Sequence, residues 1–247
     1  MALLYMKAKE TPQLFFLRTH LHNSTSYFGW EASLLLYMDD TFKNIDIYDF
    51  DGTLYKSDSS IDFCFFVYKE KPLRIFYLLI QLFWFIPYKT KIISTIKYKN
   101  IFFCFLNGLD KKQVETLVDL FWKKKTGSDF NIELINKINH VKNDTKSICI
   151  SASPEILLKN ISKELGMDLL IGSEMIFQNK KWFISKNCRG EEKIIRLHKA
   201  CNFKKIIHAY SDNKDDLKLL KKAEKGYKVF FKKNKWGLKK INKTSIL

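Results

Sequence analysis

The sequence predicts an α/β protein in which short parallel strands are followed by helices. The first observation is an apolar strand, Ile45–Tyr48, that runs directly into polar residues and a glycine. Two later apolar segments, 147–151 and 205–210, also end in polar residues, and a helical pattern follows each of them, with Ser153 as the predicted N-cap of the first of these helices. Between these two segments, residues 169–177 and 181–184 are predicted to form a hairpin around residues 178–180. The second observation is a helical pattern that fills residues 59–142, between the first strand and the second. This arrangement is typical of a parallel sheet with helices on both faces.

The composition indicates a folded protein. The chain has 247 residues, of which 46% are hydrophobic and 28% are charged. These values exclude a disordered chain, which has too few apolar residues to form a core. The length is sufficient for one hydrophobic core and one inserted or appended module.

The formal net charge of +17 is concentrated near the end of the chain. Eleven lysines and one glutamate lie between Lys218 and Leu247, and they account for +10 of the total. We interpret residues 232–247 as a basic tail. Its lysines are either solvated or in contact with a polyanion, and we expect an anionic membrane rather than nucleic acid as that partner.

The cysteines indicate a reducing compartment. Their number is odd, none form a C-x-x-C pair, and several lie in apolar runs, which argues against a disulfide framework or a zinc site. We therefore predict a cytoplasmic protein with free thiols. The cysteines are Cys64, Cys104, Cys149, Cys188 and Cys201.

Residues 1–43 show no clear periodicity and are predicted to form an N-terminal extension. They lack the sustained apolar core and the small-residue cleavage site of a signal peptide. Met38 lies just before the first strand. We therefore interpret residues 1–37 as a mis-assigned start or as a loosely packed segment.

Five helices are predicted between the first and second strands, at 61–69, 73–86, 90–106, 110–125 and 130–141. The helix at 73–86 is apolar almost all round and is expected to end at Pro87. It is shorter than the roughly 20 residues that span a bilayer. Two interpretations stay open: a buried central helix, or an interfacial helix that binds anionic lipid through its basic flanks.

Two carboxylates, Asp49 and Asp51, follow the first strand. Residues two apart on a strand point to the same face, and Gly52 allows the backbone to turn sharply after them. At the carboxyl end of a parallel strand the pair would form an acidic, concave site. Carboxylate oxygens are suitable Mg²⁺ ligands, and two adjacent carboxylates can act as a nucleophile and as an acid–base group.

Four segments in chain order resemble the motifs of the haloacid dehalogenase (HAD) superfamily. Within that superfamily they resemble the phosphoserine-phosphatase-like branch (subfamily IB). The segments are Asp49-Phe50-Asp51-Gly52-Thr53, Ser151-Ala152-Ser153-Pro154, Gly190-Glu191-Glu192-Lys193 and Asp212-Asn213-Lys214-Asp215-Asp216. The resemblance implies a Rossmann-like core at 44–58 and 143–231, and a helical C1-type cap at 59–142.

The resemblance also implies Mg²⁺-dependent hydrolysis of a phosphomonoester through an aspartyl-phosphate. Asp49 is expected to be the nucleophile and Asp51 the acid–base group. The metal would be held by Asp49, Asp212 and the backbone carbonyl of Asp51. Thr53, Ser151 and Lys193 are expected to bind the phosphate, and Asp216 to hold either a metal-bound water or Lys193.

The cap is expected to select the substrate. Asp58 is a candidate acid for binding an amino acid, and Arg74 is the only arginine of the cap segment. The apolar, aromatic cap better suits a lipid or another amphiphilic phosphate, and the chain is similar to phosphatidylglycerophosphatase C-like members of this branch. Three alternatives stay open: a phosphoserine-type phosphatase of small metabolites, a phosphotransferase, and a basic nucleic-acid- or membrane-binding module on a silent core.

Overall fold

A computed structural model of the chain describes residues 41–140 and 144–242. The segment 1–37 therefore lies outside the described residues. The first strand, β1, spans Thr41–Tyr48 and begins before the predicted core boundary at residue 44. Its early residues pair with β5, and Phe42 is buried. The sequence interpretation began only at Ile45, because Lys43 and Asn44 interrupt the apolar run.

A seven-stranded sheet forms the centre of the described part, in the order β4-β3-β2-β1-β5-β6-β7. The five middle strands are parallel, and the strand at each edge is antiparallel. This confirms the predicted α/β fold with a mostly parallel sheet. Besides β1, the strands are β2 (Thr145–Pro154), β3 (Leu169–Gln178), β4 (Lys181–Lys186), β5 (Asn202–Ser211), β6 (Lys225–Lys232) and β7 (Lys235–Lys240).

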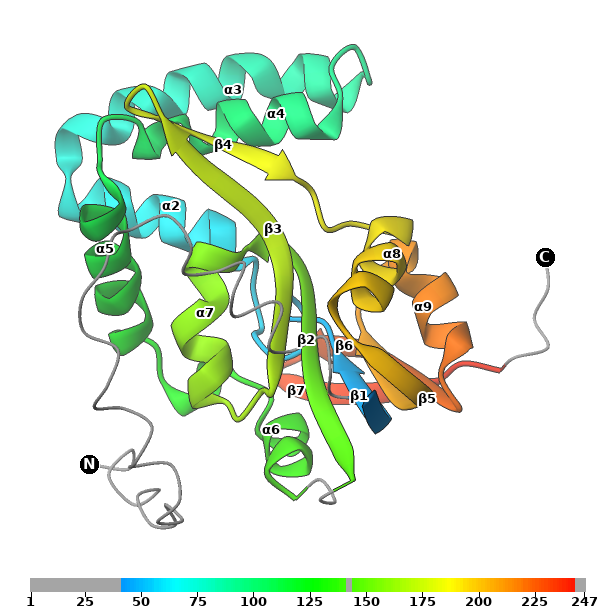
Figure 1. Cartoon of the computed structure of the whole chain (residues 1–247). Coiled ribbons are helices and arrows are strands. Elements are labelled where there is room, and N and C mark those ends of the chain that lie inside the picture. Colours follow the sequence, from blue (N-terminus) through cyan, green and yellow to red (C-terminus); the bar gives the residue numbers. More distant parts are fainter. Residues whose placement is uncertain (1–40, 141–143, 243–247) are drawn as a thin grey trace, which may run out of the picture. The chain divides into compact units, whose positions relative to one another are not determined.

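Helices cover both faces of this sheet (Figure 1). Helix α7 (Glu155–Glu164) packs on β2 and β3 from one side, and α8 (Glu191–Ala200) and α9 (Leu217–Lys222) pack on the other. Strand residues alternate between the two faces. Accordingly, Ile47 is buried in the cluster under α8 and α9, while its neighbour Tyr48 is buried in the cluster on the opposite face.

Five α-helices occupy the predicted cap segment. They are α2 (Ser59–Glu70), α3 (Phe76–Lys89), α4 (Thr95–Phe102), α5 (Lys111–Lys123) and α6 (Ile132–Asn139). Short 3₁₀ turns lie at Pro72–Ile75, Phe103–Leu106 and Gly127–Asp129. The predicted start of α5 is confirmed, because Asp110 and Gln113 form a reciprocal capping box in which each side chain accepts the other's backbone N–H.

Helix α3 differs from its prediction in two respects. It continues through Pro87 to Lys89 instead of ending before the proline. Pro87 removes one hydrogen bond near the end of the helix, and the freed carbonyl, that of Phe83, belongs to a residue that is well exposed to water. The interpretation of α3 as a buried central helix is wrong, because Gln81 is its only fully buried residue.

The two edge strands are formed by hairpins with two-residue turns. Asn179 and Lys180 connect β3 to β4 with positive φ angles of 51° and 59°, as the predicted hairpin requires. Lys233 and Asn234 do the same between β6 and β7. The prediction of a basic tail at 232–247 is therefore wrong for its first part, which is an ordered strand of the sheet.

The second strand also runs further than predicted. Strand β2 continues to Pro154, which pairs with Ser173 of β3, and α7 begins at Glu155. Ser153, predicted as the N-cap of this helix, lies in the strand instead. Its hydroxyl is thereby free to contact the site described next.

Candidate active site

A cavity of about 670 Å³ lies where the carboxyl ends of β1 and β2 meet the start of α8 and the cap helices α2, α3 and α4. Open α/β sheets bind ligands at the carboxyl ends of their strands. Six of the predicted site residues line this cavity. They are Asp49, Asp51, Asp58, Ser151, Lys193 and Asp212.

Asp49 follows β1 directly, and its backbone N–H donates to the carbonyl of Tyr210 on the neighbouring strand at 2.9 Å. The residue is 7% exposed. One carboxylate oxygen lies 3.1 Å from Lys193 Nζ, and the other accepts a hydrogen bond from Ser211 Oγ at 3.0 Å. Burial raises the pKa of Asp49 to about 7 even though Lys193 acts in the opposite direction.

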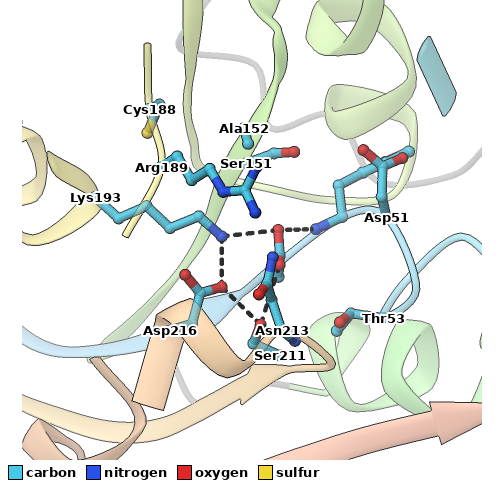
Figure 2. Close-up of polar contacts among 12 residues, drawn as sticks. Asp51, Thr53, Ser151, Ala152, Cys188, Arg189, Lys193, Ser211, Asn213 and Asp216 are labelled. Atoms are coloured by element: carbon cyan, nitrogen blue, oxygen red, sulfur yellow. Dashed lines mark hydrogen bonds and ion pairs between the residues drawn. The ribbon is translucent and has the colours of Figure 1, made fainter. Parts of the chain in front are cut away.

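Lys193 is 2% exposed and bridges two carboxylates (Figure 2). Its ammonium lies 2.6 Å from Asp216 Oδ2 as well as 3.1 Å from Asp49. Burial disfavours the charged form, but the two carboxylates outweigh it and hold the pKa of Lys193 above its ordinary value. Of the two roles predicted for Asp216, the structure therefore places this residue against Lys193.

Asp51 has a different environment. Its carboxylate accepts a hydrogen bond from the backbone N–H of Ser59, at the start of α2, at 2.7 Å. Ser153 Oγ, from the end of β2, donates to the other oxygen at 2.5 Å. No cation forms an ion pair with Asp51 among the described residues. Burial, followed by the charge of Asp58, raises the pKa of Asp51 to about 6, although the hydrogen bonds act to lower it.

Gly52 brings the loop after β1 close to the loop after β5. It has a positive φ of 67°, and a Cβ at this position would lie 2.3 Å from Asp212 Oδ2. Only glycine fits here, because both the backbone conformation and the close approach exclude a side chain. The carboxylate of Asp212 is thereby held at the same edge of the cavity as Asp49.

Thr53, which was predicted to bind the phosphate, does not line the cavity. It is fully buried. Its Oγ1 accepts a hydrogen bond from the backbone N–H of Asp212 at 3.0 Å, and its carbonyl accepts one from Asn131 Nδ2 at 3.2 Å. Thr53 therefore positions the loop that carries Asp212, because the tight turn at Gly52 directs its side chain into the protein.

The oxygen-rich end of the cavity fits the predicted metal. The carboxylates of Asp49 and Asp212 both line it, and oxygen donors are what Mg²⁺ prefers. Among the described residues no group of three His, Cys, Asp or Glu side chains is placed to hold a metal. That observation is compatible with a site made of these two carboxylates, the backbone carbonyl of Asp51 and water. The side chain of Asp51 is already engaged by hydrogen bonds from Ser59 and Ser153.

Besides Lys56 and Lys89, which also line the cavity, two further cationic residues there were not predicted. Arg189 precedes α8 and is held by Asp215 through its Nε at 2.8 Å. Lys99, on cap helix α4, donates to the carbonyl of Ala152 and to Asn187 Oδ1, both at 2.7 Å. Burial, reinforced by the charge of Arg189, lowers the pKa of Lys99 to about 8. Neither residue stood out in the sequence, because it contains 43 lysines and arginines.

The two cap residues considered for an amino-acid substrate behave differently. Asp58 lines the cavity and also caps α2, accepting the backbone N–H of Ile61 at 3.0 Å. Arg74 is engaged in the cap itself, where its Nη1 donates to the carbonyls of Phe105 and Asn107 at 2.7 and 2.9 Å. Arg74 therefore stabilises the cap and does not line the cavity.

A parallel sheet that gathers carboxylates, a lysine and hydroxyls around one cavity is typical of an α/β enzyme. A family model described as haloacid dehalogenase-like hydrolase matches residues 47–221, which is more than half of the chain. The chain belongs to this family, as its motifs predicted. The predicted similarity to phosphatidylglycerophosphatase C-like members is not confirmed by the matches described here.

The sequence is also similar to a curated protein, Protein CicA from two strains of Caulobacter vibrioides. The identity is 33% over 91 residues, a segment that covers 34% of this chain and 41% of CicA. The match therefore spans less than half of the length of the curated relative.

Solved structures with a similar fold include a Bordetella pertussis protein of unknown function, with a TM-score of 0.61 and 15% identity over 73% of this chain and 86% of that chain. A HAD family hydrolase from Salmonella enterica serovar Typhi has a TM-score of 0.54 and 14% identity, covering 75% and 62%. A probable phosphoserine phosphatase from Vibrio cholerae has a TM-score of 0.53 and 11% identity, covering 81% and 63%. At these identities the likeness shows the fold alone.

Proposed function

We propose that this protein is a phosphatase that hydrolyses phosphomonoesters through an aspartyl-phosphate on Asp49. The observation that carries the proposal is the contrast between two neighbouring carboxylates. Asp49 is paired with the buried ammonium of Lys193, whereas Asp51 is held by an amide and a hydroxyl and forms no ion pair among the described residues. Two carboxyl groups kept in different environments are suited to nucleophilic and acid–base roles, respectively.

In the first half of the reaction a carboxylate oxygen of Asp49 attacks phosphorus. The new bond to Asp49 forms as the bond from phosphorus to the leaving oxygen breaks, and protonated Asp51 gives its proton to that oxygen. In the second half Asp51 takes a proton from water, the water oxygen attacks phosphorus, and the bond to Asp49 breaks. Inorganic phosphate leaves and both side chains return to their starting states.

Fixed charges and dipoles stabilise the transferring group. Lys193 can neutralise a phosphoryl oxygen while Asp216 keeps its ammonium in place. The hydroxyl of Ser151 lines the same cavity beside the start of α7, where a phosphate oxygen is favoured. Asp49, Asp212 and the backbone carbonyl of Asp51 would hold Mg²⁺, which supplies charge neutralisation at the phosphoryl oxygens.

The cap side of the cavity favours an amphiphilic substrate. Aromatic side chains from α3 and α4 line it, including Phe85, Tyr88, Tyr98 and Phe102. Such a wall suits a lipid phosphate or another phosphate with an apolar part. A small zwitterionic metabolite is the second candidate, because Asp58 and Lys99 also line the cavity and could pair with an ammonium and a carboxylate.

The test is release of inorganic phosphate from an aryl phosphate, with Mg²⁺ and with chelator. The wild type should turn over only with the metal, and Asp49→Asn should lose at least about 10⁴-fold in kcat, because the nucleophile is removed. Asp110→Asn is the matched control, since asparagine also caps helices. Metal-independent turnover, or full activity of Asp49→Asn, would contradict the proposal.

A panel of lipid and soluble phosphates then distinguishes the two substrate classes. Efficient turnover of soluble phosphates with no turnover of lipid phosphates would exclude the amphiphilic substrate. Added alcohols test for phosphoryl transfer to an acceptor other than water, which would appear as a new phosphate ester in place of inorganic phosphate.

A further inference from the structure

Helix α3 carries an apolar stripe on its outer side. Phe76, Leu79, Phe83 and Ile86 recur at intervals of three and four residues, which places them on one face of the helix. Each of these side chains is between 66% and 72% exposed. A contiguous exposed apolar surface of this kind marks an interaction site in a soluble protein.

The inward side of α3 is polar at its centre. The buried Gln81 accepts a hydrogen bond from Tyr68 Oη at 2.8 Å and donates one to the carbonyl of Phe102 at 2.6 Å. The helix therefore directs the Gln81 amide, together with the partly buried Tyr77 and Leu78, into the cap and the four side chains of the stripe outward. Burial of apolar surface normally stabilises a helix in the opposite orientation, so this polarity indicates an apolar environment outside the cap.

The surroundings of the stripe are exclusively basic. No aspartate or glutamate occurs between Glu70 and Asp110, a stretch that holds six basic residues. Two of them, Lys89 and Lys99, line the cavity. The other four, Lys71, Arg74, Lys91 and Lys97, flank α3 or lie on α4. A second copy of the chain would bring like charges together across this face, whereas anionic lipid headgroups would complement them.

The dimensions and the aromatic residues match a bilayer surface. No helix of the described residues is long and apolar enough to cross a membrane, and α3 itself has 14 residues. A helix with an apolar face and basic flanks lies in the plane of the interface. Trp84, with Lys97 stacked 5.9 Å from its ring, is suited to the headgroup region.

We propose that α3 is an interfacial helix that docks the cap on a bilayer containing anionic lipid. The apolar stripe enters the acyl boundary, and the flanking lysines contact the headgroups. Helix α3 lies between the membrane-facing stripe and the catalytic cavity, because its Phe85, Tyr88 and Lys89 line that cavity. Figure 1 shows α3 beside α4 at the end of the cap most distant from α6. Docking goes beyond the proposed phosphatase activity and does not depend on it.

The experiment is co-sedimentation of the full chain with vesicles of equal parts phosphatidylcholine and phosphatidylglycerol, and with phosphatidylcholine vesicles. Binding should be strong on the anionic vesicles and weaken with salt. Leu79→Glu/Phe83→Glu should lower the partition coefficient at least about tenfold, because two inserted side chains are replaced by charges. Leu120→Glu/Ile195→Glu is the matched control: these exposed apolar residues lie on α5 and α8, and binding should change less than about twofold.

Circular dichroism melting shows whether each variant is folded, and Asp49→Asn should bind vesicles like the wild type. Loss of phosphatase activity and loss of docking are therefore separate results. Three outcomes would overturn the proposal: no binding by the folded wild type, equal binding of neutral vesicles, or binding unaffected by the α3 change. A dimer that dissociates in the α3 variant, without vesicle binding, would assign the stripe to self-association.

Discussion

A buried lysine from the core and a half-buried lysine from the cap line the same cavity, and their environments differ. Lys193, from the core, lies against Asp49 and Asp216, which hold its pKa above the ordinary value. Lys99, from the cap, donates hydrogen bonds to a carbonyl and an amide oxygen, and burial lowers its pKa to about 8. The core thus provides a charge that is fixed at all physiological pH values, whereas the cap provides one that responds to pH. Changes in the core should alter kcat, and changes in the cap should alter KM.

After Asp49→Asn, the largest effect on turnover is expected from Asp51→Asn. Removing the acid–base group should lower kcat about 10²- to 10⁴-fold for an alkyl phosphate. The loss should be smaller for an aryl phosphate, whose leaving oxygen needs less help from a proton. Steady-state kinetics with both substrates checks this, and an equal loss for both would argue against Asp51 as the acid.

Lys193→Met should affect both catalysis and folding. Loss of the cation should lower kcat about 10²- to 10³-fold. It also leaves two buried carboxylates unpaired, which should lower the free energy of unfolding by about 3–5 kcal/mol near neutral pH. The destabilisation should shrink at low pH, where Asp49, whose pKa is raised by burial, takes up a proton. Denaturant unfolding measures it, with the exposed Lys199→Met on the same helix as control.

Gly52→Ala should separate a steric effect from backbone strain. Its Cβ would lie 2.3 Å from the carboxylate of Asp212, so we expect up to about a 100-fold loss in kcat and a higher Mg²⁺ requirement. Gly190→Ala is the control, because Gly190 also has a positive φ, 60°, but has nothing within 4 Å of the added Cβ. Similar losses in both variants would show that strain, and not the displacement of Asp212, is responsible.

The smallest effect is expected from Lys99→Met, which should raise KM about tenfold at pH 7 by removing one anion-binding charge. The wild-type KM should itself rise between pH 7 and 9, because Lys99 is protonated below its pKa of about 8 and loses its charge above it. The KM of the variant should stay flat over this range. Lys97→Met, on the exposed side of the same helix, is the control. A wild-type KM that does not change between pH 7 and 9 would contradict the claim that Lys99 supplies a pH-dependent charge.

The sequence was sufficient to place together the main site residues that the core contributes. Asp49, Asp51, Asp212 and Lys193 each follow a strand or open a helix, and the topology of a parallel sheet brings those positions together. Ser153 was assigned wrongly because a serine before a proline also suits a helix N-cap, and only pairing of Pro154 with β3 shows that the strand continues.

The cap half could not be predicted in the same way. The role of Lys99 depends on how α4 packs over β2, and periodicity does not specify that packing. The apolar sequence of α3 is equally compatible with a buried and an exposed helix, because a helix that is apolar all round has no preferred side. The buried Gln81 determines which side of α3 faces the cap, because it forms hydrogen bonds with Tyr68 and Phe102, which are distant in the sequence.

Strand β7 has a practical consequence for any attempt to reduce the basic charge of the chain. Trp236 and Leu238 pack against the core, and the strand satisfies the backbone groups along the outer edge of β6. Truncation at residue 232 would leave Val229, Phe230 and Phe231 on an unpaired edge, which favours intermolecular strand addition. In the intact sheet β7 is the edge strand, and its lysines guard that edge against such association. Neutralising them one by one is therefore a safer way to probe their charge than shortening the protein.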